Sequence, residues 1–249
     1  MIKSKKLKKF TKINHGFFNN SGGFSSGIYK SLNCGFGSKD KRKNILKNLK
    51  VVSKKIGTKK TIILLHQVHS SKIYFLKKSP KKKLVGDGLI TNIKGLAIGI
   101  LTADCAPIIF FDCKKNIIGA VHAGWKGAYK KIGKKMINYF KKKGSKLSDL
   151  YAIIGPSISQ DNYEIKKDFR NKFLNQSLTN KKYFKMVKNK IFFDLKGYIF
   201  KQLKNSGVKN IEIIKKDTFN PKNNFFSARR SLKKKHNDYG RNISIIMIK

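Results

Sequence analysis

The sequence has few acidic residues and few arginines. Only 12 of its 249 residues are Asp or Glu, against 58 Lys and Arg, so the formal net charge is +46. Carboxylates are therefore scarce as metal ligands. Only five basic residues are arginines, and the lysines are scattered along the chain rather than gathered in one stripe. This distribution favours a compositional bias of surface positions over nucleic-acid binding, although the positive field attracts anions such as phosphate.

Cysteines and long apolar runs are also scarce. The three cysteines, at positions 34, 105 and 113, are odd in number and lack paired spacing. This argues against a disulfide framework and favours a reducing, cytoplasmic location. No apolar segment of secretory length follows the basic N-terminus, and no stretch reaches the roughly 20 apolar residues that span a bilayer, so we expect no membrane partner. Because no Pro- or Ser-rich linker divides the chain, we expect one domain over residues 1–249.

The apolar residues predict a mixture of helices and strands. Helical spacing predicts helices over 40–57 (with Asp40 as its cap), 125–143, 165–186 and 194–205. Apolar runs predict strands over 61–69, 72–77, 86–91, 95–112 with a break at 102–107, 116–124, 151–159, 211–216 and 242–248. Residues 14–38 read as loops or a hairpin, and residues 1–12 as a strand or a loose basic arm. Because the elements do not alternate strictly, we expect an α/β mixed (α+β) fold of mixed β-sheets covered by helices.

Three segments end predicted strands with a residue that binds metals. They are HQVHS, TADCAP and VHAGWKG, and they offer His69, Cys105 and His122. Zinc favours imidazole nitrogen and thiolate sulfur, and three protein ligands leave a fourth position for water or substrate, as in catalytic zinc sites. Because the three residues are far apart in sequence, their spacing alone is a weak indication of a metal site.

Several of these residues also have a structural interpretation. His66 lies three positions before His69, and residues three apart on a strand point to opposite faces, so we interpret His66 as a core or rim histidine. Cys105 could fill the core, as free cysteines often do, but its place beside Asp104 at a strand break favours exposure. Trp125, the only tryptophan, either stacks on a flat ring or caps the core.

The C-terminal stretch FFSARRSLKKKHNDYGRN contains three of the five arginines. In a chain that otherwise uses lysine, arginine is expected where its planar fork matters, as in binding phosphate or carboxylate. Arg229, Arg230 and Arg241 are therefore candidate phosphate ligands. The alternative is that this stretch is a solvated surface run.

Taken together, the motifs resemble the YfiH-type laccase-domain family. Its members were described as multicopper polyphenol oxidases and later as zinc purine nucleoside phosphorylases. Matching segments follow in order at 15–33, 67–69, 86–91, 102–108, 120–127, 154–159, 225–230 and 238–241. The combination of TADC and VHAGWKG is specific. The resemblance implies a mixed α/β fold and a metal bound by His69, Cys105 and His122, whereas His66 matches no ligand position.

The sequence departs from the family pattern at two positions. The family often has Asn-Arg in the first long helix, but Leu49 follows Asn48 here, so a basic group is lost or is supplied by Lys50. Phe219 stands where the family often has a cysteine. Neither departure affects the three expected ligands.

The resemblance also implies an activity. It implies zinc-dependent phosphorolysis of adenosine, inosine and S-methyl-5′-thioadenosine, and deamination of adenosine. Phosphorolysis needs phosphate at the sugar C1′, cations to hold it and an acid for the leaving base, whereas deamination needs a metal-activated water at the purine C6. Asp104, beside Cys105, is the candidate for proton handling or for supporting the ligand.

Three alternatives stay open at this point. The first is a copper-dependent polyphenol oxidase, since two His and one Cys also suit copper, although five histidines cannot furnish several copper sites. The second is a cysteine hydrolase in which His122 activates Cys105. The third is a non-enzymatic nucleic-acid binder driven by charge.

Overall fold

The structure is a computed structural model that describes residues 1–249. Its strands are β1 (Ile13–Phe17), β2 (Ile73–Leu76), β3 (Gly88–Thr91), β4 (Ile98–Thr102), β5 (Ala106–Asp112), β6 (Ile117–Ala123), β7 (Leu150–Ile154), β8 (Glu164–Ile165), β9 (Phe184–Val187), β10 (Lys190–Phe193), β11 (Asn210–Ile213) and β12 (Asn242–Ile248). Its α-helices are α1 (Arg42–Ile56), α2 (Trp125–Tyr129), α3 (Ile132–Lys142), α4 (Lys167–Gln176), α5 (Leu195–Asn205) and α6 (Ala228–Lys233). Short 3-10 helices cover Gly27–Tyr29, Gln160–Asn162, Leu178–Tyr183 and Pro221–Asn223. None of the helices combines the length and the apolar character needed to cross a membrane.

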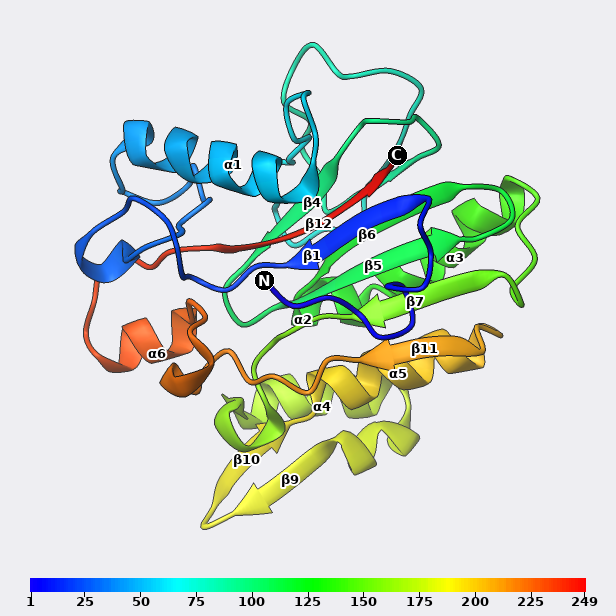
Figure 1. The fold of residues 1–249 in the computed structure, drawn as a ribbon. Coiled ribbons are helices and arrows are strands. Elements are labelled where there is room, and N and C mark those ends of the chain that lie inside the picture. Colours follow the sequence, from blue (N-terminus) through cyan, green and yellow to red (C-terminus); the bar gives the residue numbers. More distant parts are fainter.

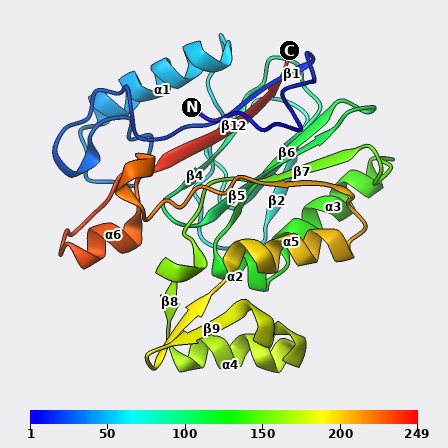
Figure 2. The same cartoon turned by 60° about the horizontal axis from the view of Figure 1, so that its bottom comes forward.

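Two sheets stack face to face at the centre of the molecule, and helices cover both outer faces (Figure 1, Figure 2). The larger sheet has the order β11-β7-β5-β6-β3-β2 and the smaller has the order β1-β12-β4. Helix α1 packs on the outer face of the smaller sheet, and α2, α3 and α5 pack on the outer face of the larger one. A third sheet, β8-β10-β9, lies beside α4 at one end. The expectation of mixed sheets covered by helices is confirmed.

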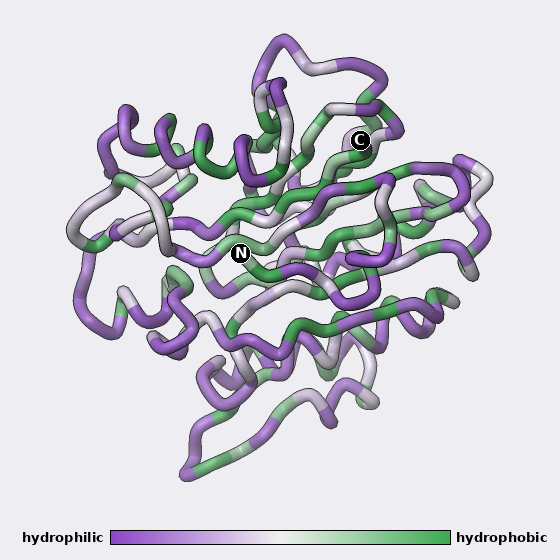
Figure 3. Tube along the Cα trace, viewed as in Figure 1, coloured by the Kyte–Doolittle hydropathy of each residue, from purple (hydrophilic) through white to green (hydrophobic).

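Alternation of side chains along the central strands explains this layering. In β5, Phe110 faces α3, whereas Phe111 faces the smaller sheet, because successive side chains of a strand point to opposite faces. In β12, Ile246 faces the larger sheet and Ile245 faces α1. Figure 3 shows apolar residues along these strands and hydrophilic residues along the outer loops. Three apolar layers therefore hold four layers of secondary structure together.

Two elements differ from the predicted helices. The helix predicted over 125–143 is divided into α2 and α3, because Lys131 adopts a left-handed conformation with φ of 57°. The helix predicted over 165–186 ends at Gln176, and its last residues belong instead to the hairpin of β9 and β10. Phe184 stacks on Phe193 across this hairpin, with ring centroids 5.1 Å apart, so aromatic packing overrides the helical spacing there.

Two further predictions concern segments near the candidate site. Residues 61–69 are extended but form no regular strand, and they make only single bridges at Ile63 and His66. Asp40 does not cap α1, which begins at Arg42. Its carboxylate instead accepts hydrogen bonds from Ser25, from Asn33 and from the backbone of Lys41.

The N-terminal residues 1–12 are packed against the edge of the larger sheet and are not a loose arm. The carboxylate of Glu212 in β11 accepts hydrogen bonds from Ser4 Oγ at 2.6 Å and from the backbone N–H groups of Lys5 at 3.0 Å and Lys6 at 2.8 Å. Leu7 is fully buried. One carboxylate thus holds this lysine-rich segment in a turn conformation against the sheet.

Replacing Glu212 should release this segment. Because hydrogen bonds to a charged acceptor are strong, we expect Glu212→Gln to lower the free energy of unfolding by about 1–2 kcal/mol and to speed tryptic cleavage within residues 1–12. The control is Asp161→Asn, whose exposed ion pair with Lys185 is expected to contribute little. Equal cleavage rates in Glu212→Gln and the unmutated protein would refute the assigned role.

Candidate metal centre

His69, Cys105 and His122 come from three separate segments and meet at one end of the larger sheet. Cys105 directly precedes β5, His122 lies near the end of β6, and His69 lies in the loop before β2. Strands β5 and β6 are antiparallel neighbours, with Pro107 opposite His122, so the start of one strand meets the end of the other. The structure therefore brings together the three residues that the sequence singled out.

The donor atoms have the chemistry and the spacing of a zinc site. One thiol and two imidazoles are ligands that zinc prefers. Their donor atoms all lie within 4.8 Å of one another, and Cys105 Sγ is 3.9 Å from His69 Nε2. Zinc bonds of about 2.0 Å to nitrogen and 2.3 Å to sulfur put tetrahedral ligand atoms roughly 3.5 Å apart. Small side-chain rotations would therefore bring this set to ligating distance.

Asp87, which the sequence analysis did not single out, orients two of these residues. Its carboxylate Oδ1 lies 2.8 Å from His122 Nδ1. This contact leaves Nε2 of the ring as the atom that can bind a metal together with His69 and Cys105. The same carboxylate accepts hydrogen bonds from the backbone N–H groups of Val68, His69 and Ser70. Asp87 has no exposed surface. A single buried carboxylate thus fixes both the ring of His122 and the loop that carries His69.

Sheet pairing places Asp87 where it can do this. Strand β3 runs antiparallel to β6 with Gly88 opposite Val121, and Asp87 directly precedes β3. The backbone N–H of His122 donates to the carbonyl of Asp87 at 2.8 Å. A signal for Asp87 was present in the sequence: an acidic residue between two glycines, before an apolar strand, in a chain with only 12 acidic residues.

The two loops that present His69 and Cys105 are held in unusual conformations. His69 has φ of 57° and Asp104 has φ of 84°, a left-handed region that residues other than glycine seldom adopt. Such a conformation costs on the order of 1 kcal/mol and persists only where the surroundings enforce it. At His69 the hydrogen bonds to Asp87 supply that enforcement.

At the loop that carries Cys105, the side chain of Asp104 itself holds the left-handed backbone conformation in place. Its carboxylate accepts hydrogen bonds from Thr218 Oγ1 at 2.7 Å, Ser227 Oγ at 2.9 Å and the backbone N–H of Arg229 at 2.7 Å. Burial raises the pKa of Asp104, although these three donors oppose the shift. Of the two roles expected for Asp104, this arrangement favours support of Cys105 over proton handling, because its oxygens are already occupied.

Gly124 leaves the space that the centre needs. A Cβ atom at this position would lie 2.7 Å from Cys105 Sγ and 3.1 Å from His69 Cδ2. Both distances are too short for any other residue to be accommodated without moving the donor groups. The glycine of the HAGW motif is therefore explained by close approach to the thiol.

The charges at the centre favour the ionised forms of Cys105 and Asp87. Burial by itself would raise the pKa of the Cys105 thiol, but His122 and His69 beside it lower that pKa below its ordinary value. Burial by itself would raise the pKa of Asp87, but hydrogen bonds from His122 and Ser70 lower it to about 2. Cysteine binds metals as the thiolate, and a lowered pKa favours that form. Burial by itself would lower the pKa of His122, but Cys105 and Asp87 raise it to about 9, so metal binding must displace a proton from this ring.

The centre opens into a cavity of about 300 Å³. His66, Gln67, Tyr239 and Arg241 contribute to its walls. His66 belongs to the rim, as expected, and is not among the clustered donors. Gln67 is fixed because its side chain both donates to and accepts from the backbone of Leu101, in place of a strand partner.

The three candidate arginines have different surroundings. Arg241 lines the cavity beside the centre, and its Nη1 donates to Asp238 and to the carbonyl of Tyr239. Arg229 lines a cleft of about 620 Å³ with Tyr163 and Trp125, and it also lines a cavity of about 200 Å³ that Cys105 borders. Arg230 donates to three backbone carbonyls, those of Thr218, Phe219 and Phe225, and lines none of these spaces.

Of the two interpretations of Trp125, the structure confirms that it caps the core, whereas stacking on a flat ring stays a prediction. Its ring packs against Phe169, with centroids 5.0 Å apart, at the margin of the core between the larger sheet and its helices. It also contributes a wall of the 620 Å³ cleft. The ring therefore caps the core on one side and borders an open space on the other.

Comparison with known proteins agrees with these features. A family model described as multi-copper polyphenol oxidoreductase laccase matches residues 14–249. The chain belongs to this family. The resemblance inferred from the sequence motifs is thereby confirmed.

Relatives in sequence and structure extend this result. A curated relative from Rickettsia conorii, named purine nucleoside phosphorylase, is 36% identical over 172 residues, which cover 68% of this chain and 71% of the relative. A relative of the same name from Haemophilus influenzae is 30% identical and covers 90% of both chains. The crystal structure of the Bacillus licheniformis hypothetical protein YfiH superposes with a TM-score of 0.88 at 27% identity, covering 98% of this chain and 94% of that one.

Replacing Asp87 should weaken metal binding without unfolding the protein. We expect Asp87→Asn to raise the Kd for zinc by about 10- to 100-fold, because the amide neither holds the His122 tautomer nor accepts as strongly from the His69 loop. Competition with a chromogenic chelator measures this Kd. The control is Asp112→Asn. Asp112 is buried at the far end of β5, and its carboxylate accepts hydrogen bonds from the backbone N–H groups of Lys114 and Lys115. An unchanged zinc Kd in folded Asp87→Asn would contradict the orienting role.

Proposed function

We propose that this protein is a zinc-dependent purine nucleoside phosphorylase. It converts adenosine, inosine or S-methyl-5′-thioadenosine and phosphate into the free base and the sugar 1-phosphate, and it also deaminates adenosine. The observation that carries the proposal is the convergence of His69, Cys105 and His122 on one point beside a cavity that Arg241 lines. The names of the curated relatives support the phosphorylase part of this activity.

His69, Cys105 and His122 would hold the metal. When bound there, zinc supplies Lewis-acid chemistry to whatever group occupies its open position. Asp87 keeps the His122 ring in place, and Gly124 leaves space beside the thiol. The protein's part is thus to fix the donor set rigidly and to leave one side of it accessible.

The phosphate in this proposal binds to Arg241. Phosphorolysis breaks the bond between the sugar C1′ and the purine nitrogen and forms a bond from C1′ to a phosphate oxygen; the electron pair leaves with the base, which takes up a proton. The Nε and Nη2 groups of Arg241 make no hydrogen bond within the chain, so they can donate to phosphate oxygens. Arg230 is committed to backbone carbonyls, so it is not retained as the phosphate ligand. Arg229 lines a small cavity that Cys105 also borders, so it stays the second candidate.

Removing the thiol should abolish metal binding and activity together. We expect Cys105→Ala to lose most of its zinc, measured by elemental analysis, and its nucleoside turnover, because the thiolate is a ligand. Cys113→Ala, a half-buried cysteine outside the centre, is the control. Unmutated protein that is active but free of metal would favour a cysteine hydrolase, and copper in place of zinc would favour the oxidase.

Phosphate dependence tests the reaction class. We expect inosine cleavage to require phosphate and to yield ribose 1-phosphate, whereas ammonia release from adenosine should not require phosphate, because water is the nucleophile there. Arg241→Lys keeps the charge but loses the bidentate fork, so it should raise the KM for phosphate about tenfold or more and affect deamination less. Arg170→Ala on α4 is the control. Free ribose formed at the same rate without phosphate would make the enzyme a nucleosidase.

A further inference from the structure

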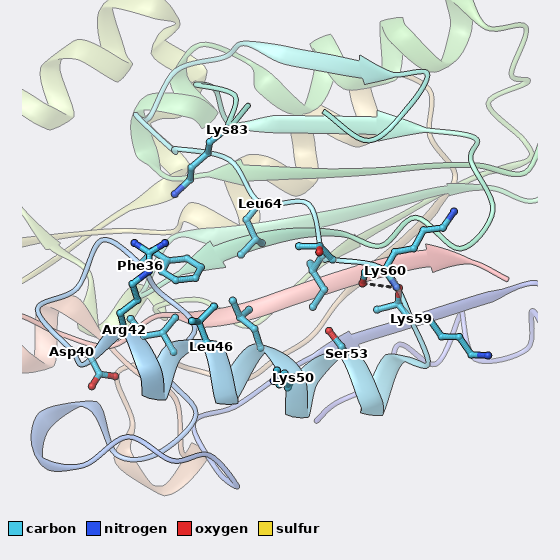
Figure 4. A pocket seen from close by; sticks show the side chains of 15 residues that line it. Phe36, Asp40, Arg42, Leu46, Lys50, Ser53, Lys59, Lys60, Leu64 and Lys83 are labelled. Carbon is cyan, nitrogen blue, oxygen red and sulfur yellow. Dashed lines mark hydrogen bonds between the residues drawn. The ribbon is translucent and has the colours of Figure 1, made fainter. Parts of the chain in front are cut away.

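A groove of about 900 Å³ lies between α1 and the extended residues 58–64, outside the metal centre (Figure 4). Its floor is apolar: Ile45, Leu46 and Leu49 come from α1, and Ile62 and Leu64 come from the extended segment. In the close-up, the side chains of Leu46 and Leu64 point toward one another across the groove. Leu46 is 47% exposed, although it lies in the middle of a helix that packs on a sheet. Ile45 and Ile62 are buried, so the apolar surface that the chain leaves uncovered comes mainly from Leu46, with half-buried Leu49 and Leu64 beside it.

One wall of the groove is the extended segment 61–65, whose outer edge is free at two residues and ends at His66, where the backbone pairs with Leu84 and Gly86. Ile63 pairs with β4 on one side, donating to the carbonyl of Ala97 and accepting from Gly99. Because backbone groups of neighbouring residues in an extended chain point to opposite sides, those of Ile62 and Leu64 point away from β4. The N–H and C=O groups of these two residues make no hydrogen bond within the chain. Unpaired edge groups of this kind are a template for another strand.

The rim of the groove is cationic. Arg42, Lys50, Lys59, Lys60 and Lys83 line it, and Asp40 is the single acidic residue among the lining side chains. The carboxylate of Asp40 accepts hydrogen bonds from Ser25 and Asn33 and forms no ion pair with the rim, which keeps a net positive charge. An acidic occupant complements this charge, and a basic one is repelled.

We propose that this groove docks an extended, acidic peptide segment of a partner protein. The segment adds as a strand to the free edge at Ile62 and Leu64, and its alternate side chains seat against Leu46 and Leu49 of α1. A helix and a strand edge that together border an apolar groove are the elements used when peptides bind by strand addition. The groove adjoins the cavity of the metal centre, because Phe36 and Lys83 line both, but none of the three metal-centre donors lines the groove.

The shape and the backbone groups favour a peptide over a free lipid or a small anion. Such ligands use an apolar floor or a cationic rim, but they have no regular series of donors and acceptors for the two unpaired residues. A strand beside residues 61–65 would extend over about 16 Å at 3.3 Å per residue. This length accommodates a short segment with side chains alternating between groove and solvent.

Alternate backbone methylation tests the proposal directly. The probe is a fluorescein-labelled hexapeptide of alternating Glu and Val, measured by fluorescence polarisation in 0.15 M salt. Two further peptides carry N-methyl groups on either the Glu or the Val residues. Only one edge of an added strand faces Ile62 and Leu64, so one methylated peptide should bind at least about tenfold more weakly and the other should bind nearly as the parent does. Equal affinity of the two methylated peptides, or no binding of the parent, overturns the proposal.

Protein variants and amide exchange locate the site. Leu46→Glu should weaken parent-peptide binding about fivefold or more, by repulsion and loss of apolar contact. Asn44→Glu has the same charge change on α1 but lies outside the groove, and it should leave affinity within about twofold. Binding should also slow hydrogen exchange at the amides of Ile62 and Leu64. Equal effects of the two variants, or unchanged exchange at these amides, would mean that the positive charge alone attracts the peptide and would overturn the groove as its site.

Discussion

The buried carboxylate of Asp87 is the contact on which the candidate centre depends. It lies 2.8 Å from His122 Nδ1 and accepts the N–H groups of three successive residues in the His69 loop. These bonds compensate the burial of a charge that would otherwise be costly. Through them a single carboxylate positions two donor residues, His69 and His122, that are 53 positions apart in sequence. Loss of that group would alter the ring of His122 and the backbone of His69 at once, although neither residue had changed.

The stacked sheets explain why such an arrangement is possible. Antiparallel pairing of β6 with both β3 and β5 brings Asp87, Cys105 and His122 to the same end of the larger sheet. The interior of the fold fixes only the strands, and the loops beyond them carry the donors. The rigid strands therefore fix where the donor residues lie, whereas the strained turns at His69 and Asp104 fix the direction in which the donor side chains point. This division follows from the chemistry: a donor must leave the ladder of backbone hydrogen bonds to face a cavity, and its loop then needs other partners.

The same division decides what could be predicted from the sequence. Apolar runs and motifs predicted the central strands, the mixed fold and the three donor residues. They did not predict that Lys131 would break a helix, or that Phe184 and Phe193 would form a hairpin, because both outcomes depend on contacts made in three dimensions. Residues 61–69 have the composition of a strand but pair only at single points, and at Gln67 the side chain makes the hydrogen bonds to the backbone of Leu101 that a strand would make with its own backbone. The partners of Asp87, Asp104 and Arg230 likewise come from distant segments.

The scarce residue types mark the positions where their chemistry is used. Asp87, Asp104 and Glu212 each accept hydrogen bonds from backbone N–H groups. Lysine cannot replace a carboxylate in that role, because an ammonium group has no acceptor. Arg230 reaches three carbonyls at once, which the point charge of a lysine does less well. At exposed positions no such geometry is imposed, and lysine accumulates there. A large excess of positive charge is thus compatible with a specific site. The few acidic residues near the site lie inside the fold, where backbone N–H groups need an acceptor.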